Sequence, residues 1–139
     1  MSYDKNNVFA KILAGELPSY SVYSDDHCLA FMDLMPQSPG HTLVIPKAPA
    51  ENLFDVPEEA LRATIVATQK VAAAVKEAFA AEGVMIAQLN GAAAGQTVFH
   101  LHFHIIPRNQ GADLTMHAKE MADGAMLAEH AERIKACLG

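Results

Sequence analysis

The clearest pattern of hydrophobic and polar positions in this chain is a strict alternation near residue 100. Histidines take every second position and bulky apolar residues take the others, in the order Phe99, His100, Leu101, His102, Phe103, His104, Ile105. A period of two is typical of a β-strand, whose successive side chains point to opposite faces. The pattern therefore predicts a strand with a row of imidazoles on one face and core residues on the other.

Three other segments have a helical pattern, in which apolar residues recur at spacings of three and four. They are residues 6–14, the stretch from Asp55 to Gly83, and residues 126–138. The second is the one long helix. Asp55 with Glu58 three residues later resembles a capping box, and Pro57 falls in the first turn.

Short apolar runs bounded by turn-forming residues predict four further strands, at residues 20–23, 28–32, 42–45 and 84–89. Ser24-Asp25-Asp26 joins the first two as a hairpin, and the last is expected to pair antiparallel with the histidine strand. Strands grouped in two hairpins around a long helix favour an α+β fold, with a five-stranded antiparallel sheet, over alternating βαβ units.

Length and charge narrow the classes of function. With 139 residues, 51% of them hydrophobic, the chain can bury one core and is too short for two ordinary domains. The 10 Lys and Arg against 16 Asp and Glu give a net charge of −6, and no basic run stands out. A nucleic-acid partner is therefore not expected, although a local pocket could still bind a single nucleotide.

The sequence shows no pattern typical of a signal peptide, a membrane-spanning segment or a cysteine motif. The first seven residues contain no apolar segment of the kind that opens a signal peptide, and no later apolar run is long enough to cross a bilayer. We expect a cytoplasmic protein with no membrane partner. Cys28 and Cys137 lie far apart and outside any motif, so each is interpreted as a small hydrophobic residue.

The histidine row admits three interpretations. The imidazoles could be satisfied polar groups at the edge of a core. They could be zinc ligands, since neutral imidazoles two positions apart on a strand can present nitrogen atoms to a metal. They could also act on phosphorus, with one imidazole as nucleophile and its neighbours as donors to phosphate oxygens. The adjacent Gly95-Gln96-Thr97 favours the third interpretation, because it offers further donors to an anion.

These residues resemble the signature of the histidine triad nucleotide-binding proteins, a family with His-x-His-x-His and apolar residues between the histidines. The stretch from Asn90 through Gly95-Gln96-Thr97 to Ile106 carries the resemblance, and the upstream stretch from Leu29 to Lys47, with Pro-Gly before His41, extends it. The resemblance covers about residues 7–108. It implies a single domain of that fold over residues 1–139, with a variable tail at 109–139.

The resemblance assigns roles to individual residues. It implies that His102 is the nucleophile, that His104 contacts the phosphate, and that His100 and His41 orient and polarise the row. Asn90, Gly95, Gln96 and Thr97 match the family's contacts to the phosphate and the leaving group. Asp33 matches the carboxylate that binds the ribose hydroxyls. The residues that match the enclosure of the purine base are Val8, Phe9, Ile12, Phe31, Met32 and Leu34.

The resemblance also implies a substrate class and a partner. We expect hydrolysis or transfer at the α-phosphorus of a purine nucleotide, either an adenosine phosphoramidate or a dinucleoside polyphosphate, by a homodimer. Many bacterial members hold a structural zinc with a Cys-x-x-Cys pair, but Asn7-Val8-Phe9-Ala10 stands in that place here. No metal and no cofactor are therefore expected. A zinc-dependent hydrolase and a nucleotide-binding protein with little turnover stay as alternatives.

Overall fold

The computed structural model describes residues 3–111 and 121–138. Its helices are α1 (Val8–Leu13), α2 (Glu58–Ala78) and α3 (Gly124–Cys137), with a short 3-10 helix η1 (Ala92–Ala94), and its strands are β1 (Ser21–Ser24), β2 (Cys28–Met32), β3 (Thr42–Pro46), β4 (Gly83–Ala87) and β5 (Phe103–Arg108). The strands form one five-stranded sheet in the order β1-β2-β3-β5-β4, and every neighbouring pair is antiparallel. The predicted α+β class, both hairpins and the long helix are confirmed. Part of the predicted tail, residues 112–120, lies outside the described residues.

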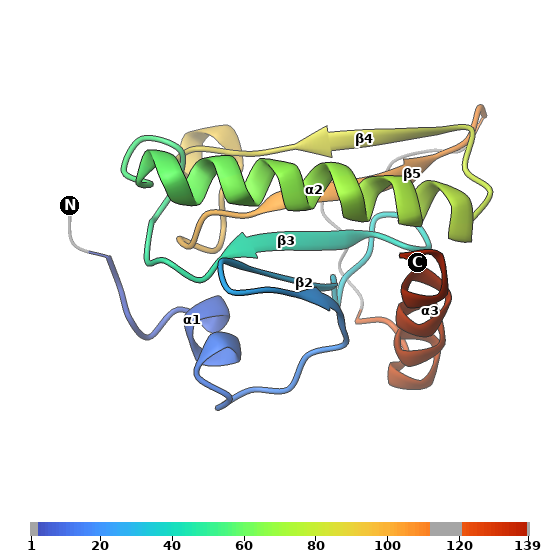
Figure 1. Ribbon diagram of the computed structural model, residues 1–139, viewed down its shortest axis with the longest axis horizontal. Helices are drawn as coiled ribbons and strands as arrows, with labels where there is room; N and C mark the ends of the chain where they lie inside the picture. Colours follow the sequence, from blue (N-terminus) through green and yellow to red (C-terminus); the bar gives the residue numbers. More distant parts are fainter. Residues whose placement is uncertain (1–2, 112–120, 139) are drawn as a thin grey trace.

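The two faces of the sheet bury different partners. Ala30 and Val44 face α2 and α3, and with Val71, Val75 and Ile134 they belong to the main hydrophobic core. The neighbouring positions on the strands point the other way, so Phe31, Leu43 and Ile45 pack with Phe9 of α1 in a second cluster. Figure 1 shows α2 lying across the sheet and α3 beside the end of the same layer. The face with α1 is only partly covered, which leaves room for a site.

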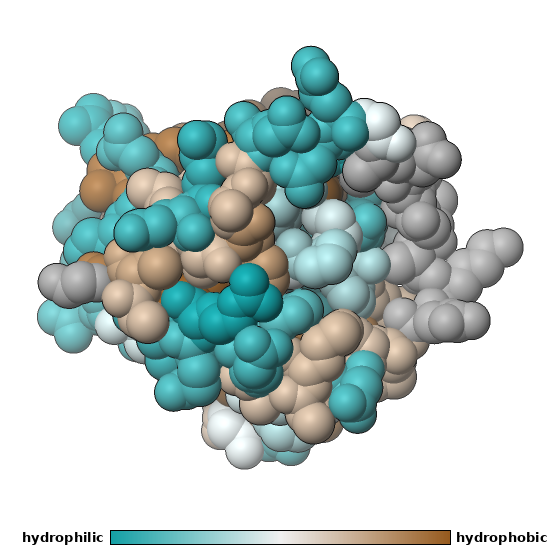
Figure 2. All heavy atoms as spheres, turned by 90° about the vertical axis from the view of Figure 1, so that its right-hand side faces the viewer, coloured by the Kyte–Doolittle hydropathy of each residue, from teal (hydrophilic) through white to brown (hydrophobic). Residues whose placement is uncertain are grey.

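The C-terminal helix completes the main core and exposes a charged surface. Leu127 and Ile134 are buried, whereas Glu129 pairs with Arg133 and Glu132 with Lys135 on the outer side of α3. At the corresponding end of the molecule, hydrophilic side chains are interspersed with apolar ones (Figure 2). Within the described residues, no helix combines the length and the apolar composition needed to span a bilayer.

The predicted histidine strand is only partly correct. Strand β5 begins at Phe103, so His104 lies in the strand while His100 and His102 precede it. Pairing between β3 and β5 ends at Val44 and Phe103. Pro46 has no N–H with which to continue the ladder, and its carbonyl accepts a hydrogen bond from the ring of His100. The chain therefore bends before β5, and the three imidazoles do not form one row on a strand face.

The predicted capping box at α2 is wrong. The helix begins at Glu58, and its N-cap, Pro57, makes no side-chain hydrogen bond. The Asp55 carboxylate instead accepts hydrogen bonds from the backbone N–H groups of Glu51 and Asn52, both at 3.0 Å. Asp55 thus closes the loop before the helix, because a carboxylate satisfies loop amides as readily as helical ones.

Candidate active site

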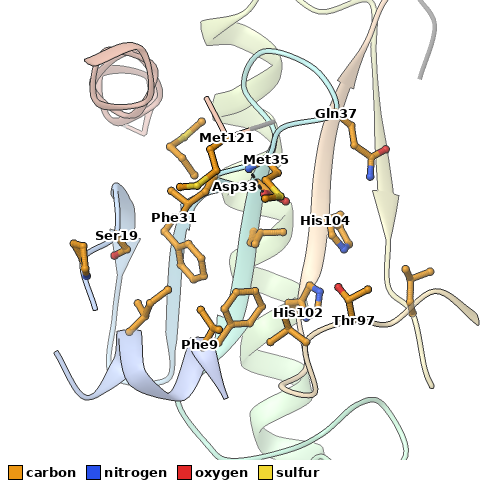
Figure 3. Close-up of a pocket in the computed structure, with 18 of the residues that line it drawn as sticks. Phe9, Ser19, Phe31, Asp33, Met35, Gln37, Thr97, His102, His104 and Met121 are labelled. Atoms are coloured by element: carbon orange, nitrogen blue, oxygen red, sulfur yellow. Dashed lines mark hydrogen bonds between the residues drawn. The ribbon is translucent and has the colours of Figure 1, made fainter. Parts of the chain in front are cut away.

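A cavity of about 550 Å³ lies on the face of the sheet opposite α2, between α1, the end of β2 and the segment before β5 (Figure 3). Most of its wall is apolar, and two imidazoles and a carboxylate enter from one side. The lining residues are Val8, Phe9, Ile12, Pro18, Ser19, Phe31, Met32, Asp33, Leu34, Met35, Gln37, Leu43, Leu89, Gly95, Thr97, Val98, His102, His104 and Met121. An apolar pocket with a few convergent polar groups is the usual form of a small-molecule site.

The apolar part of the cavity is built around two aromatic rings. Phe9 of α1 and Phe31 of β2 meet edge to face, with ring centroids 5.4 Å apart. Phe9 also meets the ring of His102 edge to face at 4.9 Å. All six residues expected to enclose a purine base line this cavity, so the structure brings Val8, Phe9, Ile12, Phe31, Met32 and Leu34 together. Phe9 joins this apolar wall to the imidazoles.

His102 is held in one tautomer by the backbone. Its Nδ1 lies 2.7 Å from the carbonyl oxygen of His100. A carbonyl only accepts, so Nδ1 carries the ring proton and Nε2 carries the lone pair. Burial, together with the neighbouring imidazoles of His104 and His100, lowers the pKa of His102 to about 4. The ring is therefore neutral near pH 7, and its Nε2 can act as a nucleophile.

His41 folds back from its loop onto His104. The backbone N–H of Gln37 donates to His41 Nδ1 at 3.0 Å, which places the ring proton of neutral His41 on Nε2. That Nε2 lies 2.9 Å from His104 Nδ1 and donates to it. The proton of neutral His104 consequently sits on its Nε2. Burial lowers the pKa of His41 to about 3 and also lowers that of His104, so both rings are neutral near pH 7.

Asp33 lies at the end of β2, beside this pair of imidazoles. Its Oδ1 accepts from the backbone N–H of Met35 at 2.8 Å, and its Oδ2 lies 3.4 Å from His41 Nε2. Burial raises the pKa of Asp33 to about 6. The carboxylate lines the cavity with two acceptor oxygens. A pair of adjacent hydroxyl groups on a ligand would suit it.

The same groups bear on the zinc alternative. Among the described residues, Asp33, His41 and His104 each offer a ligand atom, and these atoms lie within 4.8 Å of one another. A metal at this place would need the lone pair of His41 Nε2, which carries the proton as long as Gln37 donates to Nδ1. Binding would therefore require the loss of that backbone hydrogen bond. The hydrogen-bond pattern fits a proton chain better than a metal centre.

His100 lies behind the cavity and does not line it. The ring is fully buried, with 0% exposure, and its Nε2 donates to the carbonyl of Pro46 at 2.8 Å. The Tyr3 hydroxyl lies 2.5 Å from Nδ1. Burial lowers the pKa of His100. His100 thus reaches the site through its backbone carbonyl, which holds His102, rather than through its imidazole.

The residues expected to bind phosphate divide into two groups. Gly95 and Thr97 line the cavity near His102. Gln96 is 3% exposed, and its amide is used within the loops: Nε2 donates to the carbonyl of Glu51 at 2.7 Å, and Oε1 accepts from the N–H of Gly91 at 2.8 Å. Asn90 accepts from the backbone of Leu53 at 2.9 Å. Gln96 and Asn90 are outside the lining and hold the loop that presents Thr97.

Several residues of the site were not found from the sequence. Met35 and Gln37 follow Asp33 in the loop, and Ser19 lies between α1 and β1. Met121 comes from the C-terminal segment, which is attached to the end of β2 because the N–H of Ala122 donates to the carbonyl of Leu34 at 2.8 Å. No periodic pattern marks these positions. They reach the cavity through contacts between segments far apart in the chain.

Comparison with known proteins identifies relatives that share this fold. The HIT domain family model matches residues 14–111. A HIT-like protein from Bartonella henselae has a crystal structure with a TM-score of 0.92 and 51% identity, covering 98% of this chain and 99% of that one. A hypothetical histidine triad nucleotide-binding protein from Sulfolobus tokodaii gives a TM-score of 0.86 and 32% identity, covering 94% and 90% of the two chains.

A relative with a named activity is found in a plant. The adenylylsulfatase HINT3 of Arabidopsis thaliana is 40% identical over 103 residues, which is 74% of this chain and 52% of that protein. The similarity thus falls on about half of the plant protein. The activity in that name is a property of the plant protein, and it names one class of substrate, adenylyl sulfate, with which the cavity can be compared.

Proposed function

Because the chain belongs to the HIT domain family, we propose that it hydrolyses or transfers the nucleotidyl group of a purine nucleotide, with His102 as the nucleophile. One observation carries the proposal. The Nδ1–H of His102 donates to the His100 carbonyl at 2.7 Å, which leaves the lone pair on Nε2 in a neutral ring that lines the cavity. An imidazole in this state can attack phosphorus without prior loss of a proton.

The reaction has two substitutions at phosphorus. In the first, the lone pair of His102 Nε2 forms an N–P bond with the α-phosphorus, and the bond from phosphorus to the leaving group breaks with its electron pair on the leaving group. In the second, water attacks the same phosphorus, the N–P bond breaks, and the nucleoside monophosphate leaves while His102 recovers its lone pair. The proton that this water loses goes to the solvent, and an amine leaving group takes up its proton from the solvent in the first step. Transfer to another acceptor would replace water by that acceptor.

The neighbouring groups support this chemistry. The Nε2–H of His104 supplies a hydrogen-bond donor beside His102, whose ring centroid lies 4.9 Å from that of His104. Thr97 offers a hydroxyl on the same side of the cavity (Figure 3). Donors of this kind stabilise the charge that develops on the non-bridging oxygens of the phosphoryl group. No step requires a metal ion.

The rest of the cavity suits a purine nucleoside. Phe9, Phe31 and Ile12 offer an apolar seat for the base, and the Asp33 carboxylate offers two acceptors to the ribose hydroxyls. Adenosine phosphoramidates and dinucleoside polyphosphates carry the α-phosphorus that this arrangement needs. The plant relative named as an adenylylsulfatase supports the inclusion of adenylyl sulfate in the same set.

The test is a substrate panel run on the wild type and on His102→Ala. The panel contains an adenosine phosphoramidate, a diadenosine polyphosphate and adenylyl sulfate, and release of AMP is measured. His27→Ala is the control, since His27 is exposed and is not among the residues that line the cavity. We expect AMP release by the wild type and the control and none by His102→Ala. Full activity of His102→Ala would refute the proposal.

Two further measurements address the alternatives. A zinc enzyme would carry near-stoichiometric metal by elemental analysis and lose its activity to a chelator. We expect activity to survive chelation. A binding protein with little turnover would bind AMP tightly and release none from the panel, which would also contradict the proposal.

We further propose that a second copy of the chain pairs along the α2 and β4 edge. Strand β4 forms one of the two edges of the described sheet, and β1 forms the other. Ile65 and Val66 of α2 are 44% and 61% exposed, and Ile86 of β4 is 44% exposed beside them. Two such edges could join into a continuous sheet with these apolar side chains between the helices. Sedimentation is expected to give a dimer for the wild type and a monomer for Val66→Glu; a monomeric wild type would contradict the pairing.

A further inference from the structure

The segment before α1 brings a tyrosine to the back of the candidate active site. The Tyr3 hydroxyl lies 2.5 Å from His100 Nδ1, and the two rings meet edge to face with centroids 5.6 Å apart. The turn that follows holds Tyr3 in place, because Asn7 donates to the carbonyl of Asp4 from its side chain at 2.8 Å and caps α1 by accepting from the N–H of Ala10. Tyr3 is not among the residues that line the cavity.

The direction of the hydrogen bond follows from the second nitrogen of the same ring. His100 Nε2 lies 2.8 Å from the carbonyl of Pro46, so Nε2 carries the proton and Nδ1 is an acceptor. The Tyr3 hydroxyl therefore donates to Nδ1. Burial raises the pKa of Tyr3, so its hydroxyl keeps its proton near pH 7. Both nitrogens of the buried His100 ring are thus satisfied, one by Pro46 and one by Tyr3.

The fixed ring is connected to the nucleophile through the backbone. The carbonyl of His100 accepts the Nδ1–H of His102, and this bond keeps the lone pair of His102 on Nε2. Phe9 packs against both rings, with centroid distances of 6.4 Å to His100 and 4.9 Å to His102. A rotation of the His100 ring would therefore disturb the peptide and the packing that orient His102.

From this geometry we propose that Tyr3 is a positioning residue for the reaction at His102. It fixes the orientation of the His100 ring, whose tautomer the Pro46 carbonyl sets, and His100 in turn orients the nucleophile. The proposal rests on the function proposed above. Tyr3 lies before the part of the chain matched by the HIT domain model, residues 14–111, so the role belongs to a segment outside that match.

Loss of the hydroxyl would leave His100 Nδ1 without a donor in a buried place. Within the described residues, no buried side-chain nitrogen or oxygen lacks a partner. Without the Tyr3 hydroxyl, the ring could bring Nδ1 to another donor only by turning, and turning breaks the bond to Pro46. Loss of the hydroxyl is therefore expected to change the orientation of His102 more than it changes nucleotide binding.

The experiment compares Tyr3→Phe with Tyr23→Phe. Tyr23 is the matched control, because its hydroxyl donates to Asp25 at 2.7 Å at the β1–β2 turn and is not part of the cavity. For each variant we would measure kcat and KM with adenosine phosphoramidate, the thermal unfolding midpoint, and the tautomers of His100 and His102 from ¹⁵N chemical shifts in long-range ¹H–¹⁵N NMR spectra. The wild type is expected to show His100 protonated at Nε2 and His102 protonated at Nδ1.

For Tyr3→Phe we expect kcat to fall about tenfold with little change in KM, the size of effect that one lost neutral hydrogen bond produces. The ¹⁵N signal of His100 Nδ1 is expected to shift because this nitrogen loses its hydrogen bond, while Tyr23→Phe changes neither kcat nor this signal. Unchanged kcat, an unchanged ¹⁵N signal of His100 Nδ1, or a rise in KM that accounts for the whole effect would each overturn the proposal. Failure of the proposed function is distinguishable, since it would appear as activity in His102→Ala, whereas the tautomers are read without substrate.

Discussion

The two halves of the cavity are built by different kinds of contact. In the imidazole half, His102 and His104 line the cavity and His41 lies behind them, and each has a ring nitrogen held by a hydrogen bond of 2.7 to 3.0 Å. In the apolar half, Phe9, Phe31 and Ile12 are placed only by packing within one hydrophobic cluster. The imidazole half therefore determines the orientation and protonation of the reacting rings, and the apolar half determines the shape of the cavity and the area that a ligand can bury. Changes in the first should alter kcat and changes in the second should alter KM.

The largest difference between the effect on kcat and the effect on KM is expected for His104→Ala. His104 offers the Nε2–H donor beside the nucleophile, and a donor of this kind contributes about 10²- to 10³-fold to kcat. We expect kcat to fall by that factor while KM changes little. Steady-state kinetics with adenosine phosphoramidate would measure both. A rise in KM with unchanged kcat would mean that His104 only binds the ground state and would break the comparison.

The imidazole half should also make stability depend on pH. His41 and His102 have pKa values of about 3 and 4 in the folded chain and ~6.5 when unfolded, so between these values the unfolded state binds more protons. Their stabilising effect is complete above pH 6.5 and is lost as the pH falls toward the folded values. For each imidazole, the free energy of unfolding should decrease by roughly 1.4 kcal/mol for every unit by which the pH falls between ~6.5 and the pKa of the folded state.

Urea unfolding at pH 7, 6 and 5 would measure this slope. Asp33 acts in the opposite sense, since its pKa is raised to about 6 and its charging destabilises the fold as the pH rises through that value. The variant Asp33→Asn should therefore steepen the loss of stability on acidification, and His102→Ala should reduce it. Equal slopes in the wild type and His102→Ala would contradict the assignment of buried neutral imidazoles.

A smaller effect is expected in the apolar half from Ile12→Ala. Removing part of a side chain that lines the cavity should raise KM about tenfold and leave kcat unchanged, because only ground-state burial is lost. Leu13→Ala is the matched control, since Leu13 packs in the same cluster without lining the cavity. Equal KM values for the two variants would show that Ile12 does not contact the nucleotide.

The smallest expected effect is that of Met121→Ala. Met121 reaches the cavity from the C-terminal segment but is 65% exposed, so little of its surface could be buried by a ligand. We expect KM to rise about twofold with an unchanged kcat. Measurement with purine and pyrimidine substrates would show whether this side chain discriminates between bases. A change in kcat would place Met121 with the imidazole half instead.

The sequence predicted the elements well where the information is local. Apolar spacing marks α2 and the strands, and the side chain of Asp25 marks the first hairpin by accepting from the backbone of His27 and Cys28. The start of β5 was predicted too early because alternation continues through His100, while the bend depends on Pro46, a residue far away in the chain. Periodicity reports the faces of an element and cannot report where its partner strand ends.

The site was predictable in its residue types but not in its connections. Resemblance of the motif identified the apolar residues and the imidazoles that the structure brings to one cavity. The chain from Gln37 through His41 to His104 depends on the pairing of β3 with β5 and on a loop conformation. Gln96 fills its hydrogen bonds inside the loops, which a pattern of residue types cannot distinguish from contact with a ligand.

The bond from Gln37 to His41 also determines how the site responds to mutation. The donor is a backbone N–H, so replacing the Gln37 side chain leaves it in place, and proline is the one residue type that removes it. The proton order of His41 and His104 is therefore robust to almost every substitution at that position. The His100 branch has no such protection, because its donor is a side chain that a single nucleotide change can delete. Random substitutions should therefore disrupt the bond from Tyr3 to His100, which orients the nucleophile, more often than the bond from Gln37 to His41, which orients the phosphate donor His104.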